Sequence, residues 1–444
     1  MRRFRFTDPG FEEAFAAFIE ERRETPSEVE TSVREILKAV RADGLNAVLR
    51  YTRQFDGAEL DVTSVRVTAD EIASGAAQCD PEVRQAIAFA ARRIVAYHER
   101  QRPVDARFID EDGVELGWRW TPLDAVGIYV PGGRAAYPST LLMNALPARA
   151  AGVGRIAMVT PPGKLQPAVL AAAEEAGVEE IWRIGGAQAV AALAYGAEPI
   201  RPVDKIVGPG NAYVAAAKRQ VFGIVGIDAL AGPSEIVVVA DAASNPEWIA
   251  ADLLSQAEHD PAAQSILITD DEAFAAEVEA AIARQLEHLS TGASASASWR
   301  DHGATVIAPL DEAPRLVNLV APEHVEFALD HPERLADQVR HAGAIFLGRY
   351  APEAIGDYVA GSNHVLPTSR AARFSSGLSI YDFIKRTSIV KCDAAAFDAL
   401  APATVALAEA EGLPAHARSA AIRQGRGQAG QGHALANAVK PGAA

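Results

Sequence analysis

The stretch Arg155-Ile-Ala-Met-Val-Thr160 is a short apolar run that leads into a helical pattern extending to Ala176. The same alternation returns in Ile181-Trp-Arg-Ile184 and again in Lys205-Ile-Val207, which is followed by a helix through Phe222. Short buried strands that alternate with helices are typical of parallel sheets whose faces are covered by those helices. This part of the sequence therefore predicts an α/β fold.

The alternation continues toward the C-terminus, whereas the first hundred residues show a different pattern. They read as long charged helices over 12–23, 26–55 and 70–102, which would brace the sheets. The low-complexity run Thr291-Gly-Ala-Ser-Ala-Ser-Ala-Ser298 predicts a flexible loop, and an alanine-rich helical region follows Thr387. Further strands are predicted at Glu235–Ala240, Ser265–Thr269, Thr305–Ala308 and Gly343–Gly348.

Length and composition limit the classes of protein that need to be considered. A chain of 444 residues exceeds the size at which one hydrophobic core keeps growing, so we expect at least two domains. The formal net charge of -16 and the lack of a basic patch argue against nucleic acid or an anionic membrane as partner. No apolar run approaches membrane-spanning length, so the cytoplasm is the expected location.

The cysteine and histidine content points to few special roles outside the motifs. Cys79 and Cys392 are in no CxxC pattern, so we expect neither a disulfide framework nor a thiolate metal site, and we expect both to be buried small hydrophobes. Six histidines fall in charged or loop-like runs and are expected to be solvated: His98, His288, His302, His331, His341 and His433.

Two short runs far apart in the chain carry residues that suit a metal site and acid/base chemistry. Gln256 and His259 are three apart in a predicted amphipathic helix that starts at Pro246, so both would project from one face, although this spacing alone is more typical of a solvated helix surface. The second run contains Glu323 and His324. Adjacent residues within a regular strand point to opposite faces, so these two can share a site only at a strand start or in a loop.

Two glycine-containing turns are candidates for cofactor contacts. Gly208-Pro-Gly-Asn211 and Gly185-Gly-Ala-Gln188 each follow a strand and open a helix, so backbone N–H groups and the helix dipole would face an anion there. Such turns also occur simply as tight turns. Gly425-Arg-Gly-Gln-Ala-Gly430 fits the dinucleotide-binding spacing but has no strand before it and no acid after it, so it predicts no cofactor site.

Seven ordered segments, which together span nearly all of the chain, are more specific than any single spacing. They are Gly127-Ile-Tyr-Val-Pro-Gly-Gly-Arg-Ala-Ala-Tyr-Pro-Ser-Thr140, Gly185-Gly-Ala-Gln-Ala-Val-Ala-Ala-Leu-Ala-Tyr-Gly196, Asp204-Lys-Ile-Val-Gly-Pro-Gly-Asn-Ala-Tyr-Val214, Ala231-Gly-Pro-Ser-Glu-Ile236, Asp252-Leu-Leu-Ser-Gln-Ala-Glu-His-Asp260, Ala321-Pro-Glu-His-Val-Glu326 and Gly361-Ser-Asn-His-Val-Leu-Pro-Thr368. With these segments the chain resembles the L-histidinol dehydrogenase family.

The resemblance implies a fold, an activity and an assembly. It implies two Rossmann-like domains with parallel sheets, and helical terminal segments that embrace the partner subunit of a homodimer. The main domain would comprise 25–127 and 235–378, the NAD-contacting domain 128–234, and the terminal segments 1–24 and 379–444. The implied reaction oxidises L-histidinol through L-histidinal to L-histidine with two NAD+, and each subunit would hold one Zn²⁺.

The resemblance also implies roles for individual residues. His324 would take the alcohol proton, and Glu323 would help water add to the aldehyde. The implied zinc ligands are Gln256, His259, Asp357 and, from the partner chain, His416. The implied substrate contacts are these four residues with His324, Ser234, His364 and Glu411, and the implied NAD contacts are Tyr129, Gln188 and Asn211. On the sequence alone, Ser234 could equally cap a turn, His364 could be a loop histidine and Tyr129 a core residue.

Three other readings remain open at this point. A sister dehydrogenase on the same fold could oxidise another small polar diol or amino alcohol, but Glu411 and His416 suit the amine and imidazole of histidinol. A zinc hydrolase could activate water with Glu323 and use no nicotinamide. A catalytically silent binding protein is disfavoured, because every residue expected for the metal and for acid/base chemistry is present.

Overall fold

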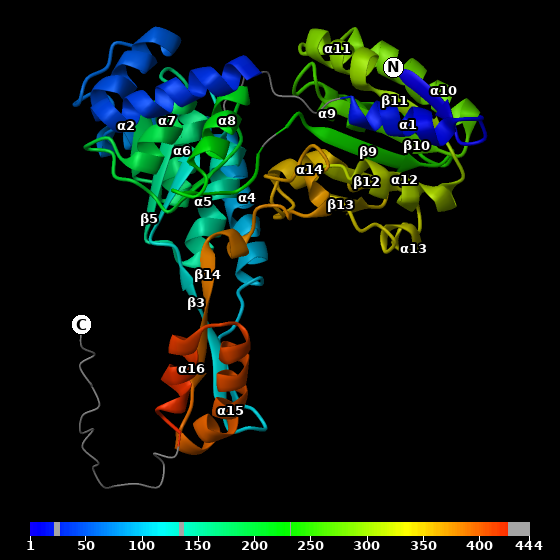
Figure 1. Cartoon of the computed structure of the whole chain (residues 1–444). Helices are drawn as coiled ribbons and strands as arrows, with labels where there is room; N and C mark the ends of the chain where they lie inside the picture. Colours follow the sequence, from blue (N-terminus) through cyan, green and yellow to red (C-terminus); the bar gives the residue numbers. More distant parts are fainter. Residues whose placement is uncertain (22–26, 133–136, 231, 425–444) are drawn as a thin grey trace, which may run out of the picture. The chain divides into compact units, whose positions relative to one another are not determined.

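The computed structural model describes residues 1–21, 27–132, 137–230 and 232–424. These residues form two compact units, one made of Met1–Arg102 with Pro122–Ile384 and the other of Pro103–Thr121 with the chain from Lys385 onward (Figure 1). The run Gly425–Gly430 and His433 lie outside the described residues.

A five-stranded sheet, in the order β6-β5-β4-β7-β8, lies in the first unit, and all of its strand pairs are parallel. Helices cover both faces. One face packs against α2, α7 and α8, and the other against α3, α4, α5 and α6. The strands are β4 (Ala125–Tyr129), β5 (Arg155–Thr160), β6 (Glu180–Arg183), β7 (Lys205–Val207) and β8 (Gly226–Ile227), and the helices are α2 (Ser27–Asp56), α3 (Ala69–Ala76), α4 (Pro81–Glu99), α5 (Pro138–Ala151), α6 (Pro167–Ala176), α7 (Gly186–Tyr195) and α8 (Ala212–Val221).

A six-stranded parallel sheet, in the order β1-β11-β10-β9-β12-β13, also belongs to the first unit. Helices α1 and α12 cover one face, and α9, α10 and α11 cover the other. The strands are β1 (Arg2–Arg5), β9 (Glu235–Ala240), β10 (Gln264–Thr269), β11 (Ala304–Ile307), β12 (His324–Ala328) and β13 (Ala344–Leu347), and the helices are α1 (Phe11–Glu20), α9 (Pro246–Ala257), α10 (Glu272–Leu286), α11 (Gly292–His302), α12 (Ala313–Val320), α13 (Glu333–Ala336) and α14 (Glu353–Tyr358).

Both sheets have a point at which the strand order reverses. The chain builds β4, β5 and β6 in one direction and then places β7 on the other side of β4; likewise β12 lies beside β9 on the side away from β10. Ligands of open α/β sheets usually bind at the carboxyl ends of the strands at such a point. At the β9/β12 reversal this edge is filled by Arg349, whose guanidinium bonds the Asp241 carboxylate at 2.9 Å and the Ala328 carbonyl at 2.7 Å.

The second unit is smaller and contains a three-stranded sheet in the order β14-β3-β2, in which β2 and β3 form an antiparallel pair. Two C-terminal helices, α15 and α16, pack against each other. The elements are β2 (Ala106–Ile109), β3 (Glu115–Pro122), β14 (Ile384–Lys391), α15 (Ala394–Ala410) and α16 (Pro414–Ala421). In the described part of the chain, no helix combines the length and apolar character that crossing a membrane requires.

The prediction of an α/β fold with two parallel sheets is confirmed. The grouping of 25–127 with 235–378 differs from the packing, because α2, α3 and α4 bury their apolar faces against the five-stranded sheet. Residues 2–20 likewise do more than form a terminal helix. Strand β1 pairs in parallel with β11 and α1 packs onto the same sheet, so this segment completes the core of its own subunit.

Three local predictions are wrong, those for the run 291–298, for His98 and for Cys392. The run 291–298, expected to be a loop, lies mostly in helix α11, because its small side chains allow close packing: Ser298 is fully buried and its hydroxyl donates to the Ala263 carbonyl at 2.8 Å. His98, expected to be solvated, is buried, and its Nδ1 lies 3.0 Å from Gln101 Oε1. Cys79 is buried as expected, but Cys392 is exposed.

Candidate active site

The amino ends of β9 and β12 bring together the residues of the candidate site. His324 is the first residue of β12 and Glu323 directly precedes it, so the two escape the alternation that would send neighbours on a regular strand to opposite faces. His324 pairs in register with Ile236 of β9. Both side chains are buried, with exposed fractions of 6% for Glu323 and 3% for His324.

Gln256, near the end of helix α9, lies beside His324. The helix ends at Ala257, so the prediction that His259 continues it is wrong, but the His259 N–H still bonds the Gln256 carbonyl at 3.2 Å in the turn that follows. Gln256 is fully buried and His259 is exposed. Gln256 therefore reaches the site from the protein interior, and His259 reaches it from the surface.

The His324 imidazole is held through Nδ1. This atom lies 3.0 Å from Gln256 Oε1 and 3.3 Å from the Glu235 carbonyl, both of which are acceptors. Nδ1 therefore carries the proton of the neutral ring, and Nε2 keeps its lone pair. Nε2 is buried and has no hydrogen-bond partner among the residues described, although Asp357 Oδ1 lies 3.7 Å away. With its lone pair free, Nε2 of the neutral ring is the atom that could accept a proton.

Carboxyl groups surround this imidazole. Burial alone would lower the pKa of His324, but the carboxylates of Glu353 and Glu323 outweigh burial and, with no cation beside them, raise the pKa to about 10, so that the imidazole is protonated at neutral pH. Burial raises the pKa of Glu323 to about 8, even though its Oε2 accepts a hydrogen bond from the Glu235 backbone N–H at 3.1 Å. The carboxyl groups of Glu323 and Glu353 beside the His324 imidazole give the site an excess of negative charge, which a bound cation would offset.

Three side chains present ligand atoms to one point. An imidazole nitrogen of His259 and carboxylate oxygens of Glu353 and Asp357 all lie within 4.8 Å of one another. Glu353 Oε1 is buried and has no hydrogen-bond donor in the described part of the chain, as would be expected of an atom that faces a cation. Imidazole nitrogen with carboxylate oxygen is a donor set that zinc accepts. The residues present therefore fit a divalent metal ion.

The remaining predicted substrate contacts divide between the two units. His364 is partly exposed, its Nδ1 lies 2.8 Å from the Asp357 carbonyl, and burial lowers its pKa. Ser234 is also partly exposed and precedes β9, where its carbonyl accepts the Gln264 N–H at 2.9 Å. Glu411 and His416 belong to the second unit: Glu411 caps the end of α15, His416 lies in the first turn of α16, and both are exposed.

The three predicted NAD contacts follow the carboxyl ends of strands in the five-stranded sheet. Tyr129 ends β4, and its hydroxyl accepts the Gly186 N–H at 2.9 Å; burial raises its pKa to about 12. Asn211 caps α8 by accepting the Tyr213 and Val214 N–H groups, each at 3.1 Å. Gln188 is 1% exposed, and its side-chain amide has no partner among the described residues. Two of the three therefore have structural contacts of their own.

In the turn after β7, the backbone of Gly208 lies close to the backbone of Tyr129. Gly208 has a φ of +106°, and a Cβ there would lie 2.3 Å from the Tyr129 carbonyl, so no other residue fits. Asp228 Oδ2 accepts the Gly208 N–H at 2.7 Å, and Lys218 Nζ donates to the Gly208 carbonyl at 3.0 Å. Lys218 and Asp228 are themselves ion-paired and buried, so the turn beside Tyr129 is held rigidly.

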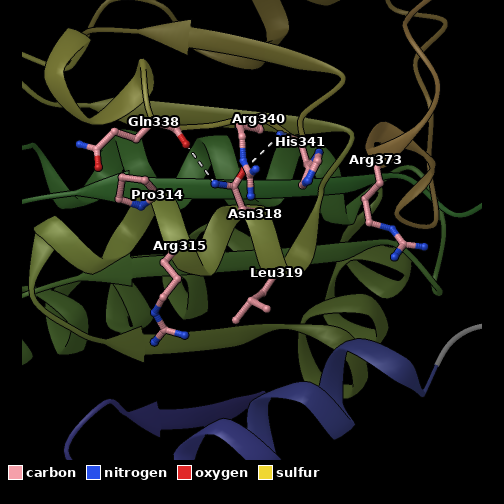
Figure 2. Close-up of a pocket in the computed structure, with 8 residues that line it drawn as sticks. All are labelled: Pro314, Arg315, Asn318, Leu319, Gln338, Arg340, His341 and Arg373. Carbon is pink, nitrogen blue, oxygen red and sulfur yellow. Dashed lines mark hydrogen bonds between the residues drawn. The ribbon is translucent and has the colours of Figure 1, made fainter.

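A pocket beside α12 shares no residue with this site (Figure 2). Its polar groups largely satisfy one another: Asn318 donates to the Gln338 carbonyl at 3.0 Å and accepts the Arg340 N–H at 2.7 Å, and Arg315 pairs with Glu12. The pocket is lined by Pro314, Arg315, Asn318, Leu319, Gln338, Arg340, His341 and Arg373.

Comparison with known proteins matches the chain over nearly its full length. The family model for histidinol dehydrogenase matches residues 19–424. The chain belongs to the histidinol dehydrogenase family. A histidinol dehydrogenase of Caulobacter vibrioides is 75% identical over 423 residues, 95% of this chain and 99% of that protein, and one of Rhodospirillum rubrum is 60% identical over 421 residues, 94% and 97%. The crystal structure of histidinol dehydrogenase from Elizabethkingia anophelis matches with a TM-score of 0.90 and 36% identity, covering 95% of this chain and 98% of that one.

The part of the chain matched to the histidinol dehydrogenase family contains every predicted site residue, from Tyr129 to His416. Sequence reasoning nevertheless missed Glu353, which lies 3.5 Å from His324 Nδ1. A signal was present, because Glu353 is four residues before Asp357 and hence on the same helix face. The contact between the Glu235 carbonyl and His324 was not predicted for a different reason. A main-chain contact does not depend on the residue type, so the sequence gives no sign of it.

Proposed function

We propose that this protein is a zinc-dependent L-histidinol dehydrogenase that oxidises L-histidinol through L-histidinal to L-histidine with two NAD+. Membership of the histidinol dehydrogenase family supports the reaction. The observation that carries the proposal is the meeting of a buried His324, with its Nε2 free, and the metal-type ligands of α9 and α14. A base and a candidate cation site lie together, an arrangement that suits the oxidation of an amino alcohol, since the base would take the alcohol proton and a cation would orient the substrate.

His324 and Glu323 are proposed as the acid/base residues. Gln256 and the Glu235 carbonyl hold the Nδ1 proton of His324. A cation bound beside Glu353 and Asp357 would offset the carboxylates that raise the pKa of His324, so that Nε2 would be neutral and able to accept the alcohol proton. Glu323 then takes a proton from the water that adds to the aldehyde. A carboxyl group whose pKa burial has raised to about 8 is suited to this exchange near neutral pH.

Gln256, His259, Asp357 and the partner subunit's His416 are proposed to hold one Zn²⁺ per subunit. Bound zinc would supply a positive template for the imidazole and amine of histidinol, and NAD+ would accept hydride. Ser234 and His364 line the substrate's position, and Glu411 is proposed to pair with its amine. Tyr129, Gln188 and Asn211, in the proposed cofactor domain 128–234, would contact NAD.

The protein is proposed to act as a homodimer in the cytoplasm. The second unit carries Glu411 and His416 on exposed surfaces, which suits residues that complete a neighbouring subunit's site. We propose no role for nucleic acid or membrane, in keeping with the net charge of -16.

Metal removal tests the function directly. Full-length protein treated with a chelator is expected to lose L-histidinol-dependent reduction of NAD+ and to regain it when Zn²⁺ is added, with two reduced nicotinamides formed per L-histidinol consumed. The absorbance of reduced nicotinamide and the yield of L-histidine are the measurements. Reduction with another amino alcohol or diol but not with L-histidinol would favour the sister dehydrogenase, and failure to reduce NAD+ with any of them would leave the zinc hydrolase as the better proposal.

Glu323→Gln is expected to slow the aldehyde step more than the alcohol step. Loss of a positioned general acid/base costs roughly 10²–10⁴-fold, and only the aldehyde step needs water to be activated. Single-turnover rates with L-histidinol and with L-histidinal would be compared, with the exposed Glu333→Gln as control. Equal slowing of the two steps would contradict the role given to Glu323.

A further inference from the structure

A buried ion pair lies beside the turn that follows β7 in the five-stranded sheet. Lys218 belongs to α8, the helix that this turn opens, and Asp228 directly follows β8. Their side chains are 3% and 5% exposed, and Lys218 Nζ donates to Asp228 Oδ1. Burying two charges costs free energy even when they are paired, so an apolar pair of similar size often fills a core equally well. Core packing alone therefore does not explain these two residues.

Both backbone polar groups of Gly208 are bonded to this pair. Asp228 Oδ2 accepts the Gly208 N–H at 2.7 Å, and Lys218 Nζ donates to the Gly208 carbonyl at 3.0 Å. Gly208 is buried and comes directly after β7, whose last residue in register with β4 is Val207. The strand ladder thus no longer pairs Gly208, and a buried backbone group without a partner is costly. The pair therefore fixes the conformation and place of the turn.

The place of Gly208 matters for two of the proposed NAD contacts. Its Cα packs on the main chain of Tyr129 so closely that a Cβ would lie 2.3 Å from the Tyr129 carbonyl oxygen. Asn211, which caps α8, comes three residues later in the same turn. The strand order reverses between β4 and β7, where open α/β sheets usually bind their ligands. A shift of Gly208 would therefore change the spacing between Tyr129 and Asn211.

Tyr129 extends this contact to the neighbouring turn. Its hydroxyl accepts the Gly186 N–H at 2.9 Å, and Gln188, the third proposed NAD contact, lies two residues further along α7. The ion pair, Gly208, Tyr129 and Gly186 thus form a continuous series of contacts across the carboxyl ends of β7 and β4.

The geometry points to Lys218 and Asp228 as positioning residues for the dinucleotide: by binding both backbone groups of Gly208, they hold the β7 turn against β4 at the spacing that NAD+ requires. We call these two residues the turn pair. The inference rests on the proposed function for the identity of the cofactor, whereas the hold on the Gly208 turn does not depend on it.

A double variant that keeps the site neutral tests this role. Lys218→Met with Asp228→Leu leaves no unpaired charge, and apolar replacement of a whole buried pair is often tolerated, so the protein is expected to fold. Its dissociation constant for NAD+ is expected to rise about tenfold, because the turn loses two hydrogen bonds. Zinc content, the KM for L-histidinol and kcat at saturating NAD+ should stay near wild type. Calorimetry of NAD+ binding and steady-state kinetics are the measurements.

A second double variant separates the hydrogen bonds from the change in polarity. Lys218→Met with Asp228→Asn is also neutral, but the Asn oxygen can still accept the Gly208 N–H. With one of the two bonds kept, the dissociation constant for NAD+ is expected to rise only about threefold. Hydrogen exchange of the peptide covering 205–214, measured without NAD+, should be faster in the Leu variant than in the Asn variant or wild type.

The same sheet offers a matched control at the opposite ends of its strands. Arg155, the first residue of β5, pairs with Glu180, the first residue of β6, at 2.8 Å, and it also donates to the Pro202 carbonyl at 2.8 Å. Both side chains are largely buried, with exposed fractions of 16% and 15%. Arg155→Met with Glu180→Leu removes a comparable pair and is expected to leave NAD+ affinity unchanged.

The outcomes separate the turn pair from the proposed function. Wild-type NAD+ affinity in the Leu variant would overturn the turn pair, as would an equal loss of affinity in the Arg155/Glu180 control. If the Leu variant did not fold, wild-type NAD+ affinity in the Asn variant would overturn it as well. If wild-type protein bound no NAD+, the proposed function would fall, and faster exchange of 205–214 in the Leu variant would still support the hold on the turn.

Discussion

The variant His324→Ala is expected to lose both oxidation steps, with kcat lowered by about 10²–10⁴-fold, the usual cost of removing a positioned general base. The expectation follows from Nδ1, which is held by Gln256 Oε1 at 3.0 Å, and from Nε2, which is buried without a partner among the described residues. Both steps should suffer, because each transfers hydride from a carbon whose hydroxyl must lose a proton.

Zinc content distinguishes this loss from a damaged site. Because His324 is not one of the proposed ligands, His324→Ala is expected to bind zinc in the same amount as wild type, as measured by elemental analysis of purified protein. His331→Ala, at an exposed histidine, is the matched control and should keep full activity. Wild-type turnover by His324→Ala would remove this residue from the mechanism.

The second large effect is expected for His416→Ala. Loss of a proposed ligand should weaken zinc binding by more than the roughly 10–100-fold that loss of an outer-shell partner costs. Activity at low zinc should fall in parallel. Ser419→Ala, also exposed on α16, is the control and should leave zinc affinity unchanged.

Mixed dimers test whether His416 acts across the subunit boundary. If it does, a dimer of one His324→Ala chain and one His416→Ala chain contains one intact site, built from the second chain and the partner's histidine. Random assembly of equal amounts of the two inactive chains should then restore about a quarter of wild-type activity. Activity that stays at the level of the two separate variants would contradict a shared site.

The local patterns predicted much of the fold because strands and helices follow from short-range periodicity. Strands such as Arg155–Thr160 and Glu235–Ala240 were predicted at their observed bounds. Edge strand β1 was not, because four residues rich in arginine pair with β11 only after the sheet exists. Helix α11 was not predicted for a similar reason. Its alanine and serine residues do not by themselves decide between helix and loop, and burial against the neighbouring helix and strand determines its conformation.

The candidate site shows the same division. Gln256, His259, Glu323 and His324 stood out from motif and family resemblance, whereas Glu353 did not. An acid in an apolar strand such as β12 looks like a solvent-facing residue, and only packing shows that Glu326 is buried.

The amino-acid sequence by itself determined the alternation of strands and helices, the family and the residue types available for chemistry, since these depend on neighbours along the chain. The tertiary structure alone decided that β9 lies between β10 and β12, and that the amino ends of β9 and β12, with α9 and α14, form the site. Strand order depends on which apolar faces pack together across hundreds of residues. For that reason no local pattern could reveal that Gln256, His324 and Asp357 meet, or that Arg349 fills the opposite edge of the same strands.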